Sequence, residues 1–271
     1  MELTSAAIIK ELLQKYSKRP SKSMGQNFLI DKSVLANIIK TANIEPGDTV
    51  LEIGPGIGTL TQELAKKAAR VITVEKDPMM VAILQETLVG FSNVKVLQED
   101  ILSAKLELPE KYNVVANVPY YITSPIIRLF LEAKHQPQEM VLMVQKEVAQ
   151  RICATPPDMS ILAVSVQFYA KTNIIATVSK GCFWPVPNVD SAIIVITPTP
   201  TKNVDTAKFF KIIKAGFAHP RKQLAGNLTE GLGMQKTDVE TWLLQHNIKP
   251  NQRAETLSLQ DWLNLANTDT F

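Results

Sequence analysis

The sequence predicts an α/β fold built on a seven-stranded sheet, followed by a small domain that consists of helices only. Short apolar runs typical of buried strands alternate with segments of helical periodicity between residues 49 and 197. After the proline-containing stretch 197–201, which reads as a linker, apolar residues recur only at helical spacing. We therefore place one domain at residues 1–198 and a helical domain at residues 199–271.

The composition indicates a globular protein with a sizeable core, because 45% of the 271 residues are hydrophobic and 20% are charged. No apolar run approaches the roughly 18 residues that a membrane span needs. The formal net charge is only +3, so nucleic-acid binding would depend on local basic clusters rather than on overall charge.

Cysteine and histidine usage predicts neither a disulfide framework nor a metal site. The chain has two cysteines, Cys153 and Cys182, and three histidines, and none of these residues stand at metal-ligand spacing. Lys10 and Glu11 interrupt the first apolar stretch, so no signal peptide is predicted. Together these features predict a cytoplasmic protein in a reducing compartment.

The first segment combines a helix with a basic arm, which we define as residues 15–22. Apolar residues recur at helical spacing over residues 4–16. Lys18, Arg19 and Lys22 follow with no acidic residue between them, and they form either a solvated charge run or an arm that contacts phosphates. Residues 25–31 then mix amide and large apolar side chains, and Asp31 is the predicted N-cap of a helix to about residue 41.

A glycine loop follows the first predicted strand of the sheet, residues 49–53, and precedes a helix that runs to about residue 69. Glycines between a strand and a helix allow a ligand to approach the backbone closely. Gly54 and Gly56 match the start of the dinucleotide fingerprint G-x-G-x-x-G, but the third glycine falls at Gly58 and position 59 is a threonine. A pyrophosphate-binding loop is therefore disfavoured.

Acidic residues stand at the ends of the next two predicted strands. Glu75 follows strand 71–74, where it is placed to accept hydrogen bonds from ribose hydroxyls, although a surface acid is the alternative. Asp77 is the predicted cap of helix 78–88, and a carboxylate at 98–100, such as that of Asp100, is placed to accept from an adenine amino group. The glycine loop contains no basic residue to meet a phosphate. These features point to S-adenosylmethionine (SAM) rather than to NAD or ATP.

Four residues after the apolar strand 114–116 are suited to hold an exocyclic amino group. Asn117 offers an acceptor oxygen, and Pro119 fixes its own φ and disfavours the α region for Val118. The Val118 carbonyl is thereby available as a second acceptor, and Tyr120 offers a flat face for stacking. The alternative is a strand that ends in a simple proline turn.

The remaining pattern predicts a helix from 123 or 124 to 133, a strand at 139–144, a helix at 145–153, an ambiguous stretch at 161–170 that favours helix, and strands at 174–178 and 192–197. The proline-stiffened loop 183–191 either presents Phe183 or Trp184 to a pocket or buries an aromatic ring. In the helical domain, caps are predicted at Thr237 or Asp238 and at Ser258.

Taken together, these segments closely resemble the KsgA-type rRNA adenine N6-dimethyltransferases over nearly the whole chain. The resemblance is carried by five segments. They are an N-terminal cofactor motif at 25–31, a glycine loop at 51–61, a catalytic tetrapeptide at 117–120, a helix motif beside the pocket at 145–149 and a late aromatic-proline loop at 183–191.

The resemblance implies a Rossmann-like class I SAM-dependent methyltransferase fold with a seven-stranded, mostly parallel sheet. It also implies methylation of N6 of adenines in small-subunit (16S) rRNA, two adjacent adenines near the 3′ end, during assembly of the subunit. Residues 1–198 would form the catalytic domain and residues 199–271 would contact RNA. A monomer without metal or membrane is expected.

The family's functional residues fall on specific positions of this chain. The cofactor-binding positions are Gln26, Asn27, Leu29, Gly54, Gly56, Glu75, Asp100, Ile101 and Asn117. The catalytic positions are Asn117, Val118, Pro119, Tyr120 and Phe183. The RNA-binding positions are Lys18, Arg19, Lys22, Arg221 and Lys222, and Pro220 stands where the family often has a further arginine.

The implied chemistry needs orientation and hydrogen-bond acceptors rather than a strong base. Asn117 Oδ1 and the Val118 carbonyl would accept hydrogen bonds from the two N–H groups of the adenine amine and favour a localised lone pair. Tyr120 and Phe183 would stack on the two faces of the base, and such stacking contributes roughly 1–3 kcal/mol per base. The adenine must leave its own stack to enter, which favours a single-stranded RNA target.

Three alternatives stay open on the sequence. A large-subunit (23S) rRNA methyltransferase of the erythromycin-resistance type shares the fold and most motifs. A ribosome-assembly or transcription factor on the same fold would bind RNA without catalysis, and an intact tetrapeptide at 117–120 argues against it. A DNA adenine methyltransferase usually has two prolines or an aspartate in its tetrapeptide, unlike this chain.

Overall fold

The computed structural model describes residues 1–21, 24–200 and 202–268 of the chain. Contacts divide the protein into two compact units. The first comprises Met1–Ala149 and Asn173–Pro198, and the second comprises Gln150–Thr172 and Thr199–Phe271. Each unit has its own core.

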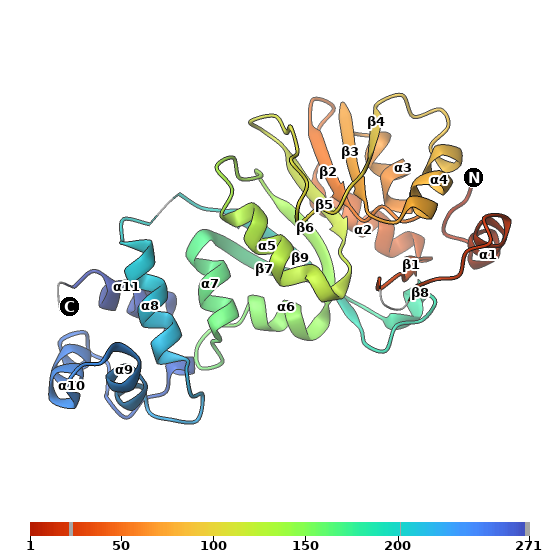
Figure 1. Ribbon diagram of the computed structural model, residues 1–271. Coiled ribbons are helices and arrows are strands. Elements are labelled where there is room, and N and C mark those ends of the chain that lie inside the picture. Colours follow the sequence, from red (N-terminus) through yellow and green to blue (C-terminus); the bar gives the residue numbers. More distant parts are fainter. Residues whose placement is uncertain (22–23, 201, 269–271) are drawn as a thin grey trace. The chain divides into compact units, whose positions relative to one another are not determined.

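The first unit is organised around a seven-stranded sheet of order β4-β3-β2-β5-β6-β9-β7 (Figure 1). The strands are β2 (Thr49–Ile53), β3 (Arg70–Glu75), β4 (Val94–Gln98), β5 (Asn113–Asn117), β6 (Met140–Gln145), β7 (Ala170–Val178) and β9 (Ser191–Pro198). The pairs from β4 to β6 are parallel, and β9 runs antiparallel to β6. The predicted seven-stranded, mostly parallel sheet is therefore confirmed.

The strand register brings the predicted site residues to one edge of the sheet. Ile53 lies opposite Val74, and Glu75 lies opposite Gln98. Because parallel strands end on the same side, the glycine loop after β2, Glu75 and Asn117 at the end of β5 all meet at the carboxyl edge.

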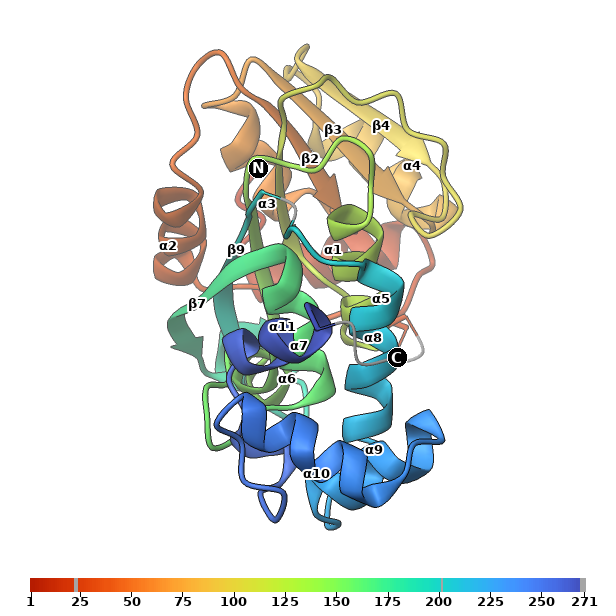
Figure 2. The same ribbon diagram turned by 90° about the vertical axis from the view of Figure 1, so that its left-hand side faces the viewer.

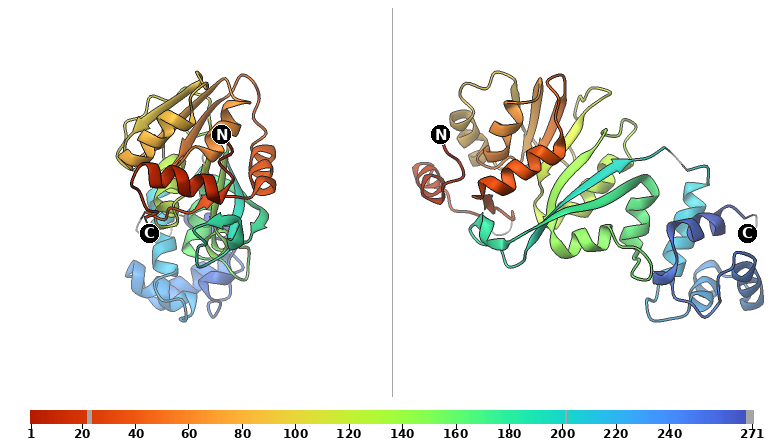
Figure 3. Two further views of the ribbon diagram at one scale, coloured as in Figure 1. Left: turned by 90° about the vertical axis from the view of Figure 1, so that its right-hand side faces the viewer. Right: turned by 180° about the vertical axis from the view of Figure 1, so that it is seen from behind.

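Helices cover both faces of this sheet. The helices of this part are α1 (Ala6–Lys15), α2 (Lys32–Ala42), α3 (Thr59–Ala65), α4 (Pro78–Thr87), α5 (Thr123–Leu131) and α6 (Lys146–Ile152), with a 3₁₀ turn at Tyr120–Ile122. Helix α5 lies in front of the sheet in Figure 1, and α2 covers the opposite face in the rear view of Figure 3. Strand β5 is accordingly buried on both faces, with Val114, Val115 and Ala116 fully buried.

A second, two-stranded sheet joins the segment before α2 to the start of the 183–191 loop. Strand β1 (Phe28–Leu29) pairs antiparallel with β8 (Phe183–Trp184), which follows a 3₁₀ turn at Lys180–Cys182. Phe28 lies opposite Trp184, and Leu29 lies opposite Phe183. Neither strand was predicted, because two residues are too few to show a period.

The second unit is helical and packs around aromatic side chains. Its helices, seen in Figure 2, are α7 (Ile161–Tyr169), α8 (Thr206–Gly216), α9 (Leu224–Leu232), α10 (Lys236–Gln245) and α11 (Leu259–Ala266), with a 3₁₀ turn at Ala254–Thr256. Phe168 of α7 stacks on Phe209 of α8 with ring centroids 4.4 Å apart, and Trp242 and Trp262 are buried in the same core. The helix favoured at 161–170 is confirmed, and its core lies in this unit.

Most predicted caps are confirmed. Asp31, Asp77 and Ser258 accept hydrogen bonds from the first-turn backbone of α2, α4 and α11. The cap expected at Thr237 or Asp238 is wrong, because α10 already begins at Lys236.

Candidate active site

A cavity of about 200 Å³ opens at the carboxyl edge of the sheet. The segments around it are the one before β1, the glycine loop, the ends of β3, β4 and β5, and the turn after β5. The predicted site residues that line it are Gln26, Asn27, Leu29, Gly54, Gly56, Glu75, Asp100, Ile101, Asn117, Val118, Pro119 and Tyr120. The structure thus brings together residues that lie up to about a third of the chain apart.

The glycine loop adopts a backbone that side chains rarely tolerate. Gly54 and Gly56 have φ angles of +67° and +57°. A Cβ at Gly54 would lie 3.5 Å from the Pro119 side chain, so the loop and the 117–120 turn pack directly against each other. The loop therefore lines the cavity with its backbone and leads into α3.

Glu75 is held in place by backbone donors. The side chain is buried, and burial raises the pKa of Glu75 while hydrogen bonds from the backbone N–H groups of Asp77 and Gly56 oppose that rise. These N–H groups donate to Oε1 at 2.8 Å and to Oε2 at 3.2 Å. The carboxylate is thus fixed in orientation beside the cavity.

Asp100 also lines the cavity and is paired with Lys76. Their Oδ2 and Nζ atoms are 2.8 Å apart, and the hydrogen bond from Lys76 lowers the pKa of Asp100. The backbone N–H of Leu102 donates to Asp100 Oδ1 at 3.0 Å. Since the Lys76 side chain is 61% exposed, this ion pair is weak enough to rearrange around a ligand.

The tetrapeptide turn presents two oxygen acceptors. Asn117 Nδ2 donates to the Asn27 carbonyl at 3.4 Å, which orients the amide. Among the described residues, no donor is hydrogen-bonded to Asn117 Oδ1 or to the Val118 carbonyl. The Val118 N–H donates to the Met143 carbonyl at 3.1 Å, so the backbone at this point is tied to β6.

Tyr120 is braced through its hydroxyl group. The hydroxyl lies 2.7 Å from Oγ of Ser191, which is fully buried at the start of β9. Burial raises the pKa of Tyr120. Tyr121, which the sequence analysis did not select, is 57% exposed and lines the same cavity.

Phe183 is not brought to the cavity. It is 1% exposed and packs in the core with residues of α2, α3 and the sheet. In the β1–β8 pair it lies opposite Leu29, which is also buried, and successive strand residues point to opposite faces. The predicted stacking position of Phe183 therefore does not agree with this structure, and the buried-aromatic alternative does.

A second cavity, about 1170 Å³ in volume, lies beside the first and shares residues 25–27, Tyr120 and Tyr121 with it. We call it the basic groove, because Lys10, Lys18 and Arg19 line it. Trp184 and residues 185–189 also line it, and Lys10 Nζ lies 5.5 Å from the centre of the Trp184 ring.

The predicted RNA-binding residues differ in their surroundings. Arg19 is exposed, whereas Lys18 is half-buried and lies 2.6 Å from Asp77. Lys22 lies outside the described residues. In the second unit Arg221 and Lys222 are exposed between α8 and α9. Lys222 is paired with Glu230 at 3.0 Å.

Glu52 is a cavity residue that the sequence analysis missed. It lies in β2 between buried aliphatic residues, is 1% exposed, and its Oε2 atom has no hydrogen-bond partner among the described residues. Burial raises the pKa of Glu52 to about 8. A charged residue inside an apolar strand that ends at a glycine loop was the available signal.

The charges around the cavity fit a cationic adenosine derivative better than a nucleotide. Glu75, Glu99 and Asp100 line it together with Glu52, whose raised pKa keeps its carboxyl mostly protonated at neutral pH, and Lys76 is the only lysine or arginine among the described lining residues. An acidic cavity repels phosphate groups and favours a positively charged ligand such as a sulfonium. The residues present therefore fit SAM.

The described residues contain neither a metal-ligand cluster nor a helix that could span a membrane. Across residues 1–21, 24–200 and 202–268, no three His, Cys, Asp or Glu side chains gather as metal ligands would. Within the same residues, every helix is too short or too polar to cross a bilayer.

Comparison with known proteins identifies the family. The family model described as "Ribosomal RNA adenine dimethylase" matches residues 17–270. A protein named ribosomal RNA small subunit methyltransferase A from Dehalococcoides mccartyi (strain CBDB1) is 43% identical, over 94% of this chain and 90% of that protein. A protein of the same name from Enterococcus faecalis is 42% identical, over 98% of this chain and 96% of that protein.

Solved structures agree with this similarity. The 23S rRNA methyltransferase ErmE has a TM-score of 0.74 at 30% identity, over 88% of this chain and 98% of that chain. A dimethyladenosine transferase from Plasmodium falciparum has a TM-score of 0.75 at 27% identity, over 88% of this chain and 95% of that chain. With the class I methyltransferase fold and the acidic cavity described above, these matches show that the chain belongs to the ribosomal RNA adenine dimethylase family.

Proposed function

We propose that the protein transfers methyl groups from SAM to N6 of adenines in small-subunit (16S) rRNA. The target we propose is a pair of adjacent adenines near the 3′ end, dimethylated while the subunit assembles in the cytoplasm. The observation that carries the proposal is the 117–120 turn, which borders the acidic cavity and whose Asn117 Oδ1 and Val118 carbonyl accept no hydrogen bond from any described residue. The small-subunit target is supported by the names of the relatives that are 42–43% identical.

The cofactor residues divide by the part of SAM that each would hold. Glu75 would accept from the ribose hydroxyls, and Asp100, with Ile101 beside it, would face the adenine. Gly54 and Gly56 would allow close approach of the backbone, and residues 26–29 would close the cavity from the N-terminal side. When bound, SAM supplies an electrophilic methyl group.

The protein's own part in the reaction is to orient and polarise the target amine. The adenine N6 lone pair is delocalised into the ring, which makes the amine a weak nucleophile. Asn117 Oδ1 and the Val118 carbonyl would accept hydrogen bonds from its two N–H groups and favour a localised lone pair directed at the methyl group. Tyr120, with its hydroxyl fixed by Ser191, would support one face of the base. We leave Phe183 out of this contact set because its ring is buried.

The basic groove is the proposed path for the RNA strand next to the target base. It shares Tyr120 and Tyr121 with the cavity, so a nucleotide extruded from the strand would enter the cavity across these rings. Arg19 would contact a phosphate there, and Lys22 would extend the same arm. Arg221 and Lys222 of the helical unit would contribute further phosphate contacts. We also propose that the protein acts as a monomer.

A large-subunit target is the second candidate, favoured by the structural similarity to ErmE. We propose to test both by offering the purified protein and labelled SAM to unmethylated small and large ribosomal subunits and to their naked RNAs. Dimethyladenosine mapped to 16S rRNA supports the proposal. Label in 23S rRNA alone would favour the second candidate, and no transfer to any substrate would indicate a non-catalytic assembly factor.

A further inference from the structure

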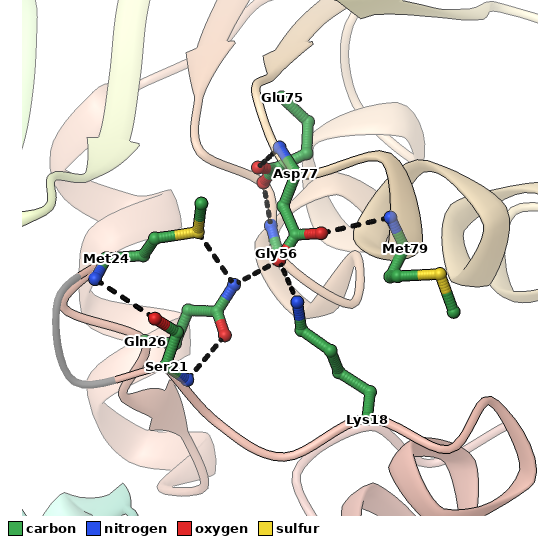
Figure 4. A network of polar contacts seen from close by, with 8 residues as sticks. All are labelled: Lys18, Ser21, Met24, Gln26, Gly56, Glu75, Asp77 and Met79. Atoms are coloured by element: carbon green, nitrogen blue, oxygen red, sulfur yellow. Dashed lines mark hydrogen bonds and ion pairs between the residues drawn. The ribbon is translucent and has the colours of Figure 1, made fainter.

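Asp77 is a buried carboxylate that joins three parts of the chain (Figure 4). Its side chain is 3% exposed, and its Oδ2 atom lies 2.6 Å from Nζ of Lys18. The same oxygen accepts a hydrogen bond from Gln26 Nε2 at 2.9 Å. The other oxygen, Oδ1, accepts from the Met79 N–H at 3.0 Å and caps α4. One carboxylate thus receives two donors from the N-terminal segment.

The backbone of Asp77 is bonded to the carboxylate that we propose to bind ribose. Its N–H group donates to Glu75 Oε1 at 2.8 Å, and the Gly56 N–H donates to Glu75 Oε2 at 3.2 Å (Figure 4). A displacement of Asp77 would therefore change the position of Glu75 and its contact with the glycine loop.

Gln26 connects Asp77 to the wall that separates the two cavities. The Gln26 side-chain oxygen Oε1 accepts a hydrogen bond from the Ser21 backbone N–H at 2.8 Å. The Gln26 backbone N–H donates to the Ser21 carbonyl at 3.1 Å. Residues 25–27 line both the cofactor cavity and the basic groove, and the Asn27 carbonyl accepts from Asn117 Nδ2. The wall thus depends on contacts that end at Asp77.

Lys18 supplies the positive charge that this arrangement needs. Burial by itself raises the pKa of Asp77, but the hydrogen bonds from Lys18 and Gln26 outweigh burial, so the pKa is lowered. A buried carboxylate that loses its cation is destabilised. Lys18, whose side chain is 21% exposed, is correspondingly less available to RNA than the exposed Arg19.

We propose that Lys18 is a positioning residue that holds the wall shared by the cofactor cavity and the basic groove, through its ion pair with Asp77. This differs from the phosphate contact predicted for Lys18 from the sequence. The inference rests on the proposed function in assigning the cavity to SAM. Although its side chain lines the basic groove, Lys18 acts through Asp77, Gln26 and Glu75 rather than through a phosphate contact of its own.

The first measurement is SAM affinity by calorimetry in the absence of RNA. We expect Lys18→Met to raise the dissociation constant about 10-fold and Lys18→Arg to stay within about 3-fold of wild type, because arginine can restore the ion pair. Lys15→Met removes the exposed ion pair with Glu86 on the same segment and is the matched control, with unchanged SAM affinity expected. At saturating SAM, turnover of Lys18→Met should recover while its KM for SAM stays raised.

The second measurement is the salt dependence of RNA binding. A single phosphate contact to a flexible strand contributes about 0.7 to the slope of log affinity against log salt. We expect Arg19→Met to lower the slope by about this amount and Lys18→Met to leave it unchanged.

Normal SAM affinity in Lys18→Met together with a lowered salt slope would overturn the proposal and make Lys18 a phosphate ligand. Unchanged values in both measurements would equally exclude a positioning role. Should Lys18→Met not fold, as judged by circular dichroism, Asp77→Asn removes the same ion pair, keeps the cap acceptor, and carries the same expectation. SAM binding is measured without methyl transfer, so failure of the proposed rRNA activity would not be mistaken for failure of this inference.

Discussion

Glu52 should make this protein less stable as pH rises, whereas an ordinary salt-bridged acid makes a protein more stable as pH rises. Burial raises its pKa from the ordinary 4.5 to about 8, so the folded protein keeps the proton up to about pH 8. In the unfolded chain the carboxyl ionises above about pH 4.5. The unfolded state therefore binds fewer protons between these values, and the free energy of unfolding falls as pH rises through this interval.

The size of the effect follows from the same interval. Each pH unit is worth about 1.36 kcal/mol, which sets an upper bound of about 5 kcal/mol over the whole range. Between pH 5.5 and pH 7.5 the contribution of Glu52 should fall by up to about 2.5 kcal/mol. Glu52→Gln removes this titration at nearly constant shape. The free energy of unfolding of the variant, minus that of wild type, should therefore increase by up to about 2.5 kcal/mol from pH 5.5 to pH 7.5.

Urea unfolding at pH 5.5 and 7.5, without cofactor, measures the difference directly. Other groups titrate in the same range, so the informative quantity is the difference between wild type and Glu52→Gln at each pH. Glu110→Gln makes the same substitution at an exposed position and serves as the control for the change itself. If wild type and Glu52→Gln lose stability in parallel, the carboxyl is already ionised in the folded protein and the reasoning is refuted.

Three further predictions test the site and the core. Asn117→Ala should lower single-turnover methyl transfer at least about 100-fold while SAM binding persists in weakened form, and wild-type transfer would exclude the proposed role. Tyr120→Phe loses the bond to Ser191 and should cost about 1 kcal/mol in urea unfolding, whereas Tyr120→Ala should reduce turnover more than SAM affinity. Gly216→Ala would place a Cβ 2.5 Å from the Trp262 ring and should destabilise by about 1–3 kcal/mol without altering SAM affinity; equal stability would show that the ring can move.

The sheet and the cavity were predictable because each rests on a local signal. The apolar run 114–116 and its counterparts at 49–53, 71–74 and 94–97 fix the strands of the parallel part of the sheet. Their carboxyl ends must then meet at one edge, so residues such as Glu75 and Asn117 are brought together without any knowledge of side-chain contacts.

Contacts between distant segments were not predictable in this way. The ion pair between Lys18 and Asp77 joins a loop to a helix cap, and neither residue type indicates the other. The burial of Phe183 follows from the β1–β8 register, in which Phe183 is directed to the core and Trp184 lines the groove. Residues 150–172 belong to the second unit by their contacts, although their apolar pattern is equally compatible with either core.

The raised pKa of Glu52 also connects stability to cofactor binding. At pH 7.5 a group with a pKa of about 8 is still mostly protonated, and a cationic ligand in the same cavity lowers that pKa because it favours the ionised form. SAM binding should therefore release up to about 0.8 of a proton in wild type and almost none in Glu52→Gln. Calorimetric titrations in buffers of different ionisation enthalpy measure this number. Identical proton release in both proteins would mean that another group responds to the cofactor and that Glu52 is only a buried structural acid.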